Sequence, residues 1–233
     1  MIYKIADLYV EMRPQYNRMT KQSVAYQSTD SIAPDIVIDI PQTVTDEFAK
    51  SNPHLDAEMC EYLLFGAEFY NKLIDFNGIL LHGSAVAVDG EVYIFTAPSG
   101  VGKSTHTGLW LEHFGDRAEI INDDKPALRV VNDKIFAFGT PFSGKYDISK
   151  NIGLPLKAIC IIERGETDSI SSVSKKQAYF EILNQSVRPK NELAYSKVLD
   201  ILETIINNVP IYRLKATISD NAVITSYEGM SAK

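Results

Sequence analysis

Residues 97–104 read Ala97-Pro98-Ser99-Gly100-Val101-Gly102-Lys103-Ser104, and this segment carries the strongest signal in the chain. An apolar run at 92–95 precedes it, and helical spacing over 104–113 follows it. A strand, a glycine-rich turn and a helix that opens with Lys-Ser are typical of a phosphate-binding loop. In such a loop, main-chain N–H groups and the positive end of the helix dipole face an anion. The segment therefore predicts nucleotide binding first and phosphoryl transfer second.

The segment departs from the usual G-x-x-x-x-G-K-[ST] pattern at one position, because Ala97 stands in place of the first glycine. The alternative interpretation is an ordinary glycine-rich turn with an exposed lysine. If the loop binds a nucleotide, Lys103 neutralises β- and γ-phosphate oxygens and the Ser104 hydroxyl binds Mg²⁺. The nucleotide-binding residues are then Ser99, Gly100, Val101, Gly102, Lys103, Ser104 and Thr105.

The composition is that of a soluble globular protein, with 233 residues, 45% hydrophobic and 23% charged. A net charge of -7 argues against nucleic acid as the main partner. No run approaches the roughly 18 apolar residues of a membrane span, and residues 1–13 do not resemble a signal peptide. Cys60 and Cys160 lie in apolar surroundings and are expected as buried free thiols. These features together predict a cytoplasmic protein with no membrane partner.

We expect two parts in the chain. Residues 1–75 are predicted as a small β-rich N-terminal extension, with short strands and turns up to about residue 42 and a helix over 56–74. Residues 76–233 are predicted as the phosphate-loop domain, packed with the extension in one compact unit. The alternation of apolar runs and amphipathic segments places the fold in the α/β class with a mixed sheet.

Two hairpins are predicted in this sheet. Apolar runs at 79–88 and 92–95 flank Asp89-Gly90, a pair that accepts the positive φ angles of a tight turn. The strand before the loop is therefore expected to pair antiparallel with its predecessor. Runs at 128–131 and 134–138 flank Asn132-Asp133 in the same way. Further elements are expected as strands at 35–40, 119–121, 156–162 and 211–214 and helices at 175–184, 193–206 and from 220 onward.

Asp123 and Asp124 follow the predicted strand 119–121 and are the candidate carboxylates of the site. Magnesium takes one or two carboxylates from a protein, so one aspartate would hold the metal and the other would accept the proton of an attacking hydroxyl. The alternative is a structural turn after a strand. The hairpin register places His82 opposite the neighbourhood of Ala97, where it could contact phosphate, a metal or an aspartate. A packed or surface histidine is the alternative.

Several other polar residues are weaker candidates. Lys125, Arg129 and Arg213 could stabilise charge on the transferred group, although most such residues are simply solvated. His106 is expected to pack or cap on the loop helix. The last candidates are Thr140, Ser143 and Lys145. They lie on a loop that either gates the site or is a plain connection.

The motif order resembles HPr kinase/phosphorylase and, more broadly, phosphoenolpyruvate carboxykinase. His82-Gly83-Ser84, the hairpin, the segment 99–104 and Asp123-Asp124 occur in the order seen in these enzymes. Segments 139–141, 154–158 and 209–214 resemble short HPr-kinase-related bacterial proteins. The resemblance runs from about residue 79 to the C-terminus.

The resemblance implies a carboxykinase-type core, ATP with Mg²⁺, and transfer of the γ-phosphoryl group to a serine-type hydroxyl on a protein, peptide or small molecule. It carries over Lys103 and Ser104 as phosphate and Mg²⁺ contacts, Asp123 and Asp124 as catalytic base and metal-side carboxylate in open order, and His82 as a site histidine. The predicted metal ligands are Ser104 and Asp124. HPr-kinase relatives are oligomeric, so the resemblance is consistent with a homo-oligomer.

The chain also departs from that family. A Glu-Ile-Arg-Gly-like segment does not follow the aspartates, which speaks against phosphorylase activity, and residues 1–75 do not resemble the enzyme's N-terminal domain. Two other interpretations stay open: a nucleotide-binding regulatory protein without turnover, and small-molecule carboxykinase chemistry.

Overall fold

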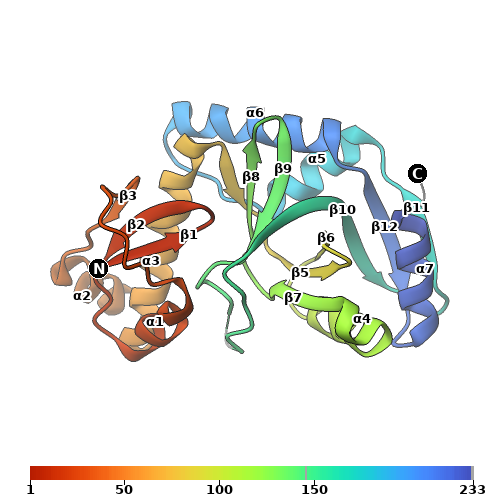
Figure 1. The fold of residues 1–233 in the computed structure, drawn as a ribbon, viewed down its shortest axis with the longest axis horizontal. Coiled ribbons are helices and arrows are strands. Elements are labelled where there is room, and N and C mark those ends of the chain that lie inside the picture. Colours follow the sequence, from red (N-terminus) through yellow and green to blue (C-terminus); the bar gives the residue numbers. More distant parts are fainter. Residues whose placement is uncertain (145, 232–233) are drawn as a thin grey trace.

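The computed structural model describes residues 1–144 and 146–231 (Figure 1). Lys145, a predicted loop residue, lies outside them. In the described residues, nine strands form one mixed sheet and three strands form a small sheet near the N-terminus. The mixed α/β class predicted from the sequence is confirmed. No helix in these residues has the length and apolar character needed to cross a bilayer.

The large sheet is organised around one long strand, β10 (Gly153–Arg164). Its first residues pair antiparallel with β9, and its later residues pair parallel with β6 on one side and β12 on the other. The remaining strands are, in sheet order, β4 (Gly78–Leu80), β8 (Ala127–Val131), β9 (Lys134–Phe138), then β10, β6 (Glu91–Thr96), β5 (Gly83–Val88) and β7 (Ala118–Asn122), with β12 (Ile211–Ala216) and β11 (Ser169–Ser172) beside the end of β10.

Both predicted hairpins are confirmed, and their turns adopt the positive φ angles that the sequence favours. Asp89 and Gly90 have φ angles of 52° and 83°, and Asn132 and Asp133 have 49° and 62°. One expectation was wrong: the apolar run 79–88 is not a single strand. It divides into β4, which pairs with β8, and β5, which pairs with β6 and β7.

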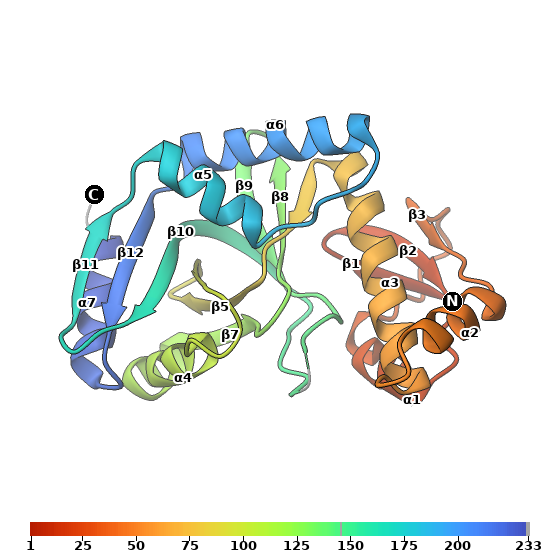
Figure 2. The same ribbon diagram turned by 180° about the vertical axis from the view of Figure 1, so that it is seen from behind.

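Helices cover both faces of the large sheet (Figures 1 and 2). Alternate residues of β5 and β6, such as Ala85 and Ile94, pack with α5 (Lys175–Asn184) and α6 (Glu192–Asn208). Their neighbours, such as Val86 and Phe95, pack with α4 (Lys103–Phe114) and α7 (Asp220–Ser231). Burial on both faces explains why these strands read as continuous apolar runs.

The N-terminal part contains more helix than the sequence predicts. Helix α2 (Gln42–Ser51) buries only Thr45, and its only apolar side chains are Val44, Phe48 and Ala49, which give a short pattern. Helix α1 (Asn17–Gln22) is short and was also missed. The other elements of this part and the short 3₁₀ turns of the chain are β1 (Ile2–Ile5), β2 (Leu8–Met12), β3 (Ile36–Ile38), α3 (Ala57–Leu73), η1 (Val24–Tyr26), η2 (Ile74–Phe76) and η3 (Gly115–Arg117).

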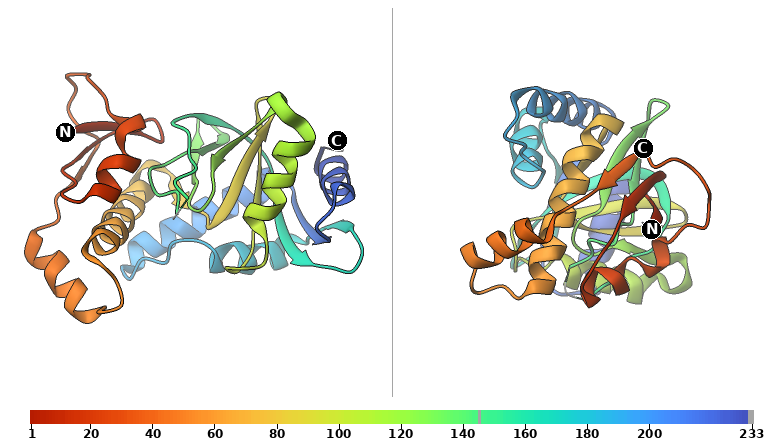
Figure 3. Two further views of the ribbon diagram at one scale, coloured as in Figure 1. Left: turned by 90° about the horizontal axis from the view of Figure 1, so that it is seen from below. Right: turned by 90° about the vertical axis from the view of Figure 1, so that its left-hand side faces the viewer.

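Helix α3 joins the N-terminal part to the large sheet (Figure 3). The Asp56 side chain caps it by accepting a hydrogen bond from the Met59 amide at 2.7 Å. Phe69 and Tyr70 of α3 contact the Phe142 ring, with centroids 5.6 Å apart in both pairs. One apolar core therefore runs from the strands β1–β3 through α3 to residues beside the large sheet. The predicted division after residue 75 stays a prediction.

We expect Trp110→Ala to lower the free energy of unfolding by about 3–5 kcal/mol, because it removes a large side chain from a closed core. Trp110 is fully buried, and its ring contacts Tyr93, Phe95 and Tyr227. Urea unfolding followed by circular dichroism measures the change. The control is Phe180→Ala at a 59% exposed position, where a much smaller loss is expected. Equal losses in the two variants would contradict the described packing of α4.

Candidate functional site

Strand pairing brings the predicted site residues to one edge of the sheet. Strand β5 pairs antiparallel with both β6 and β7, with Gly83 opposite Thr96 and Ala85 opposite Asn122. Strands β6 and β7 therefore run in the same direction, and their carboxyl ends meet the amino end of β5. The chain leaves this edge through the loop after β6 and the acidic pair after β7, and it enters the edge at His82.

A pocket of about 400 Å³ lies at this edge. Segments far apart in the chain line it together: the glycine-rich loop, the acidic pair, His82 and the loop that follows β9. Its lining residues are His82, Ser99, Gly100, Gly102, Lys103, Ser104, Thr105, Asp123, Asp124, Ser143, Gly144 and Tyr146. Of the predicted nucleotide-binding residues, Val101 is absent from this lining and lines a neighbouring pocket instead.

The glycine-rich loop has the shape of an anion cradle. Gly100 and Gly102 have φ angles of 81° and 127°, values that side-chain-bearing residues rarely adopt. A Cβ built on either glycine meets no heavy atom within 4 Å, so the loop is uncrowded at these two positions. Helix α4 begins at Lys103, directly after the loop. The positive helix end and an open glycine-rich turn fit a phosphate group.

Lys103 is buried rather than exposed, which argues against the alternative of a plain turn with a surface lysine. Its side chain folds back along the loop, and Nζ donates hydrogen bonds to the carbonyls of Ala97 at 2.9 Å and Pro98 at 3.4 Å. Burial lowers the pKa of Lys103, and the charges of Asp124 and Asp123 oppose this effect. The ammonium group therefore lies inside the loop with two carboxylates near it.

A turn stabilised by the Asn122 side chain sets the direction of the Asp123 and Asp124 side chains. Asn122 Oδ1 accepts hydrogen bonds from the main-chain N–H groups of Asp124 at 3.0 Å and Lys125 at 2.7 Å. Adjacent strand residues face opposite sides, whereas this turn lets both carboxylates line one pocket. The structural turn that the sequence offered as an alternative is present, and its capping side chain is that of Asn122.

Asp123 is held by a buried hydroxyl pair. Ser84 Oγ lies 2.6 Å from Asp123 Oδ1, to which it donates, and 2.8 Å from Thr107 Oγ1. Ser84 and Thr107 are almost fully buried, so this contact links β5, α4 and the acidic pair within the core. Sequence reasoning missed this role. The signal was available, because a serine in an otherwise apolar strand needs a polar partner.

His82 contacts both the acidic pair and the end of α5. Its Nε2 lies 3.6 Å from Asp124 Oδ1, and its Nδ1 lies 2.8 Å from Gln185 Oε1. The His82 amide also donates to the Gln185 carbonyl at 2.7 Å. Because an amide oxygen only accepts, Nδ1 carries a proton and Nε2 faces the carboxylate. Gln185 lies 103 positions away from His82 in the chain, and sequence reasoning did not find it.

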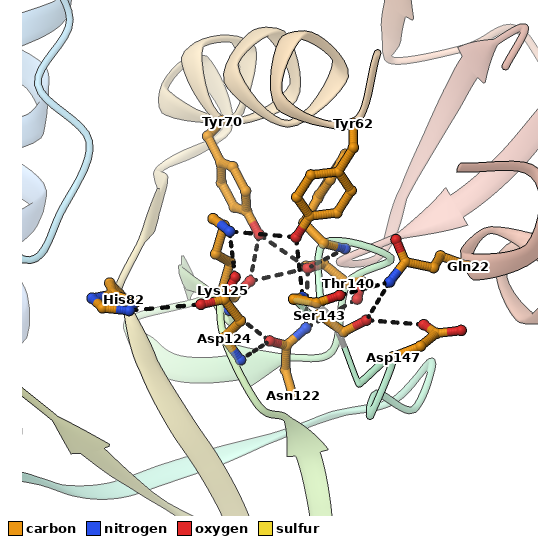
Figure 4. Close-up of polar contacts among 12 residues, drawn as sticks. Gln22, Tyr62, Tyr70, His82, Asn122, Asp124, Lys125, Thr140, Ser143 and Asp147 are labelled. Atoms are coloured by element: carbon orange, nitrogen blue, oxygen red, sulfur yellow. Dashed lines mark hydrogen bonds and ion pairs between the residues drawn. The ribbon is translucent and has the colours of Figure 1, made fainter. Parts of the chain in front are cut away.

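A tyrosine-lined network from α3 supports the other side of Asp124 (Figure 4). Lys125 forms an ion pair with Asp124, and its Nζ also donates to the Tyr62 hydroxyl at 3.3 Å. Burial disfavours the charged lysine, but Tyr62 and Asp124 outweigh it and raise the pKa of Lys125. Tyr70 donates to the Lys125 carbonyl, and its hydroxyl lies 3.0 Å from Thr140 Oγ1. Burial raises the pKa of Tyr70 well above its ordinary value.

The loop after β9 forms a wall of the pocket and is fastened by the N-terminal part. Arg18 and Gln22 of α1 donate to the Gly144 carbonyl at 2.8 and 3.0 Å. The Gly144 amide donates to the Tyr62 hydroxyl of α3 at 3.0 Å. Ser143 Oγ donates to Asp147 Oδ1 at 3.0 Å. The loop after β9 therefore lines the pocket, and residues of the first 75 positions hold this loop in place.

A larger pocket of about 630 Å³ lies on the other side of the glycine-rich loop. The ends of β10 and β12 line it, together with Val101 and other residues of the loop and of α4. Arg164, at the end of β10, donates to the carbonyls of Gly100 at 2.7 Å and Val101 at 3.2 Å. Hollows outside the carboxyl ends of parallel strands are common ligand sites in α/β folds.

Three of the weaker candidates lie away from the pocket. Arg129 donates to the carbonyls of Ala6 and Phe76, and Arg213 forms ion pairs with Glu163 and Glu181. His106 packs in the core, with Nε2 3.1 Å from Ser226 Oγ, as the sequence predicted. Cys60 and Cys160 are buried free thiols, also as predicted.

We expect His106 to lower stability in mild acid. Burial lowers its pKa from 6.5 to about 4, so the unfolded chain binds a proton between these pH values and the folded chain does not. Stability is then unaffected above pH 6.5 and falls as the pH drops toward 4, by up to about 1.4 kcal/mol per pH unit. Urea unfolding between pH 7 and 5 measures the slope, which His106→Gln should reduce and the exposed His54→Gln should not. An unchanged slope in His106→Gln would contradict a buried neutral imidazole.

Comparison with known proteins gives a family match and a likeness to solved structures. No curated protein matches the chain. The Hpr(Ser) kinase/phosphatase from Coxiella burnetii is similar at 10% sequence identity and a TM-score of 0.38, covering 66% of this chain and 99% of that one. The family model described as "SynChlorMet cassette protein ScmC" matches residues 56–223, from the cap of α3 into α7. The chain therefore belongs to the ScmC family.

Proposed function

We propose that this chain is an ATP- and Mg²⁺-dependent phosphotransferase whose acceptor is a serine-type hydroxyl on a protein, peptide or small molecule. The observation that carries the proposal is the pocket of about 400 Å³ in which the open glycine-rich loop and two carboxylates share one hollow. Phosphoryl transfer needs little covalent chemistry from a protein. It needs positioned donors for the phosphate oxygens and a carboxylate near the attacking hydroxyl.

The loop residues provide the phosphate contacts in this proposal. Main-chain N–H groups from Gly100 to Ser104 would donate to the phosphate oxygens, and Lys103 adds a buried positive charge. In the presence of phosphate oxygens, the Lys103 ammonium exchanges its two loop carbonyls for stronger charged acceptors. The larger pocket on the other side of the loop has the volume and position for the base and ribose of the nucleotide.

The oxygen ligands near the glycine-rich loop suit a magnesium ion that is also bound by the phosphates of a nucleotide. The described residues contain no cluster of three or more His, Cys, Asp or Glu side chains that could hold a metal by itself. Magnesium characteristically takes one or two protein carboxylates and completes its shell with phosphate and water. Ser104 and Asp124 are the residues that would hold it. Bound there, the ion neutralises charge on the phosphate oxygens.

Asp123 is the proposed proton acceptor. Ser84 fixes its carboxylate at 2.6 Å, while His82 and Lys125 flank Asp124. As the acceptor oxygen forms its bond to the γ-phosphorus, the bond from that phosphorus to the bridging oxygen breaks and ADP leaves. The hydroxyl proton passes to Asp123. Lys125 remains the ion-pair partner of Asp124, and Gln185 keeps the His82 ring in position beside it.

We expect Mg²⁺ and ATP to stabilise the protein, and Lys103→Met to remove most of this effect. At about a hundred times its dissociation constant, a ligand adds about 2.7 kcal/mol of stability. Thermal melting with and without Mg²⁺ and ATP measures it. The control is Lys134→Met at the tip of the β8–β9 hairpin, which should keep the full shift. An equal shift in Lys103→Met would contradict nucleotide binding at this loop.

We expect Asp123→Asn to reduce phosphoryl transfer about a hundredfold or more at saturating Mg²⁺, because the proton acceptor is lost. Asp124→Asn should instead raise the Mg²⁺ concentration needed for transfer. Radiolabelled ATP with a host lysate, followed by identification of the labelled acceptor, measures both. Asp133→Asn is the control, since asparagine tolerates the positive φ of that turn.

Two outcomes, one of the labelling assay and one of a separate decarboxylation assay, would overturn the proposal. Nucleotide binding with no labelling by the wild-type protein would favour a regulatory nucleotide-binding protein. Decarboxylation of oxaloacetate by the purified protein would favour carboxykinase chemistry.

A further inference from the structure

A third hollow lies directly beside the proposed active site, and it is apolar. Its volume is about 210 Å³, and it lies between helix α3 and the start of the large sheet. Its lining is almost entirely carbon, apart from the groups of Lys125 and two tyrosines. The lining residues are Tyr62, Leu63, Gly66, Ala67, Tyr70, Leu80, Lys125, Phe142 and Val187. The roles proposed above for phosphate, metal and nucleoside do not use it.

The hollow is large enough for one apolar side chain. An apolar cavity of roughly 150 Å³ accommodates benzene, so about 210 Å³ holds a leucyl or phenyl group. The hollow is also open to solvent, because Ala67 on α3 is exposed and Leu63, Leu80 and Val187 are only partly buried. A solvent-open apolar hollow of this kind favours a ligand with an apolar group.

The apolar hollow shares its wall with the phosphate pocket. Lys125 lines the hollow and forms an ion pair with Asp124, which lines the phosphate pocket. Phe142 lines the hollow, and the next two residues, Ser143 and Gly144, line the phosphate pocket. Figure 4 shows Lys125 between Asp124 and the two tyrosines of α3. A hydroxyl that reaches the acidic pair therefore brings its neighbouring groups to Lys125 and the hollow.

We propose that this hollow binds an apolar side chain of a peptide acceptor, at a residue next to the serine that receives the phosphoryl group. This inference rests on the proposed function for the role of the serine. The apolar hollow supplies the specificity, since a charged side chain would lose its hydration there without gaining a partner. Helix α3 thus contributes to acceptor recognition as well as to the support of Lys125.

A binding experiment tests the hollow without depending on catalysis. The probes are the blocked dipeptides N-acetyl-Ser-Leu-N-methylamide and N-acetyl-Ser-Asp-N-methylamide, added to the full chain with ¹³C-labelled methyl groups. We expect the Ser-Leu probe to shift the methyl signals of Leu63, Leu80 and Val187, and the Ser-Asp probe to leave them in place. Equal shifts with both probes, or shifts with neither, would overturn the inference.

A filling substitution gives the matched test. Ala67→Phe places a ring at the mouth of the hollow from an exposed helix position, and we expect it to weaken Ser-Leu binding at least tenfold. Asn71→Phe, one turn further along the exposed side of α3 and outside the hollow, should bind like wild type. Circular dichroism verifies that both variants fold. Unchanged Ser-Leu binding in Ala67→Phe would overturn the proposal.

A labelling arm separates this inference from the proposed function. With radiolabelled ATP, the wild type should label the Ser-Leu probe at least tenfold faster than the Ser-Asp probe, and Ala67→Phe should lose the preference while retaining the thermal shift with Mg²⁺ and ATP. Methyl shifts without any labelling would uphold the apolar hollow and count against phosphoryl transfer. Labelling of both probes at one rate would uphold transfer and overturn the apolar specificity.

Discussion

The pairing of β5 between β6 and β7 is the constraint on which the candidate site depends. This antiparallel register sets the ends of β6 and β7 and the start of β5 at one sheet edge. A slip of one residue would turn the alternating side chains of β5 to the opposite faces of the sheet. Such a slip would remove Ser84 from Asp123. The two packed faces of the sheet, each covered by helices, therefore also fix the geometry of the pocket.

The N-terminal part of the chain is structurally tied to this edge. Arg18 and Gln22 hold the Gly144 carbonyl, and Tyr62 accepts from the Gly144 amide while it contacts Lys125. These bonds connect two helices from the first 73 residues to a wall of the pocket. Helix α3 thereby supports Lys125, the charged residue beside the acidic pair. This helix precedes residue 79, where the resemblance to HPr kinase/phosphorylase begins. The shape of the acceptor side of the pocket depends on both parts of the chain.

Much of the sheet could be predicted because its turns and strands carry local signals. Asp89-Gly90 and Asn132-Asp133 mark positive φ angles, and the register of the first hairpin places His82 at the loop end. The site partners Gln185 and Tyr62 could not be predicted, because they reach His82 and Lys125 through tertiary packing across 103 and 63 positions. Helix α2 was not predicted, because Val44, Phe48 and Ala49 are its only apolar side chains and give too short a pattern.

The central claim is that the glycine-rich loop and the acidic pair bind one metal–nucleotide complex between them. The most direct measurement replaces Mg²⁺ by paramagnetic Mn²⁺ and records the NMR signals of the labelled protein in the presence of ATP. The account predicts strong broadening of the amides from Gly100 to Thr105 together with those of Asp123 and Asp124, while the tip of the β8–β9 hairpin stays sharp. Binding of Mn²⁺ and ATP with sharp signals at the acidic pair would contradict it.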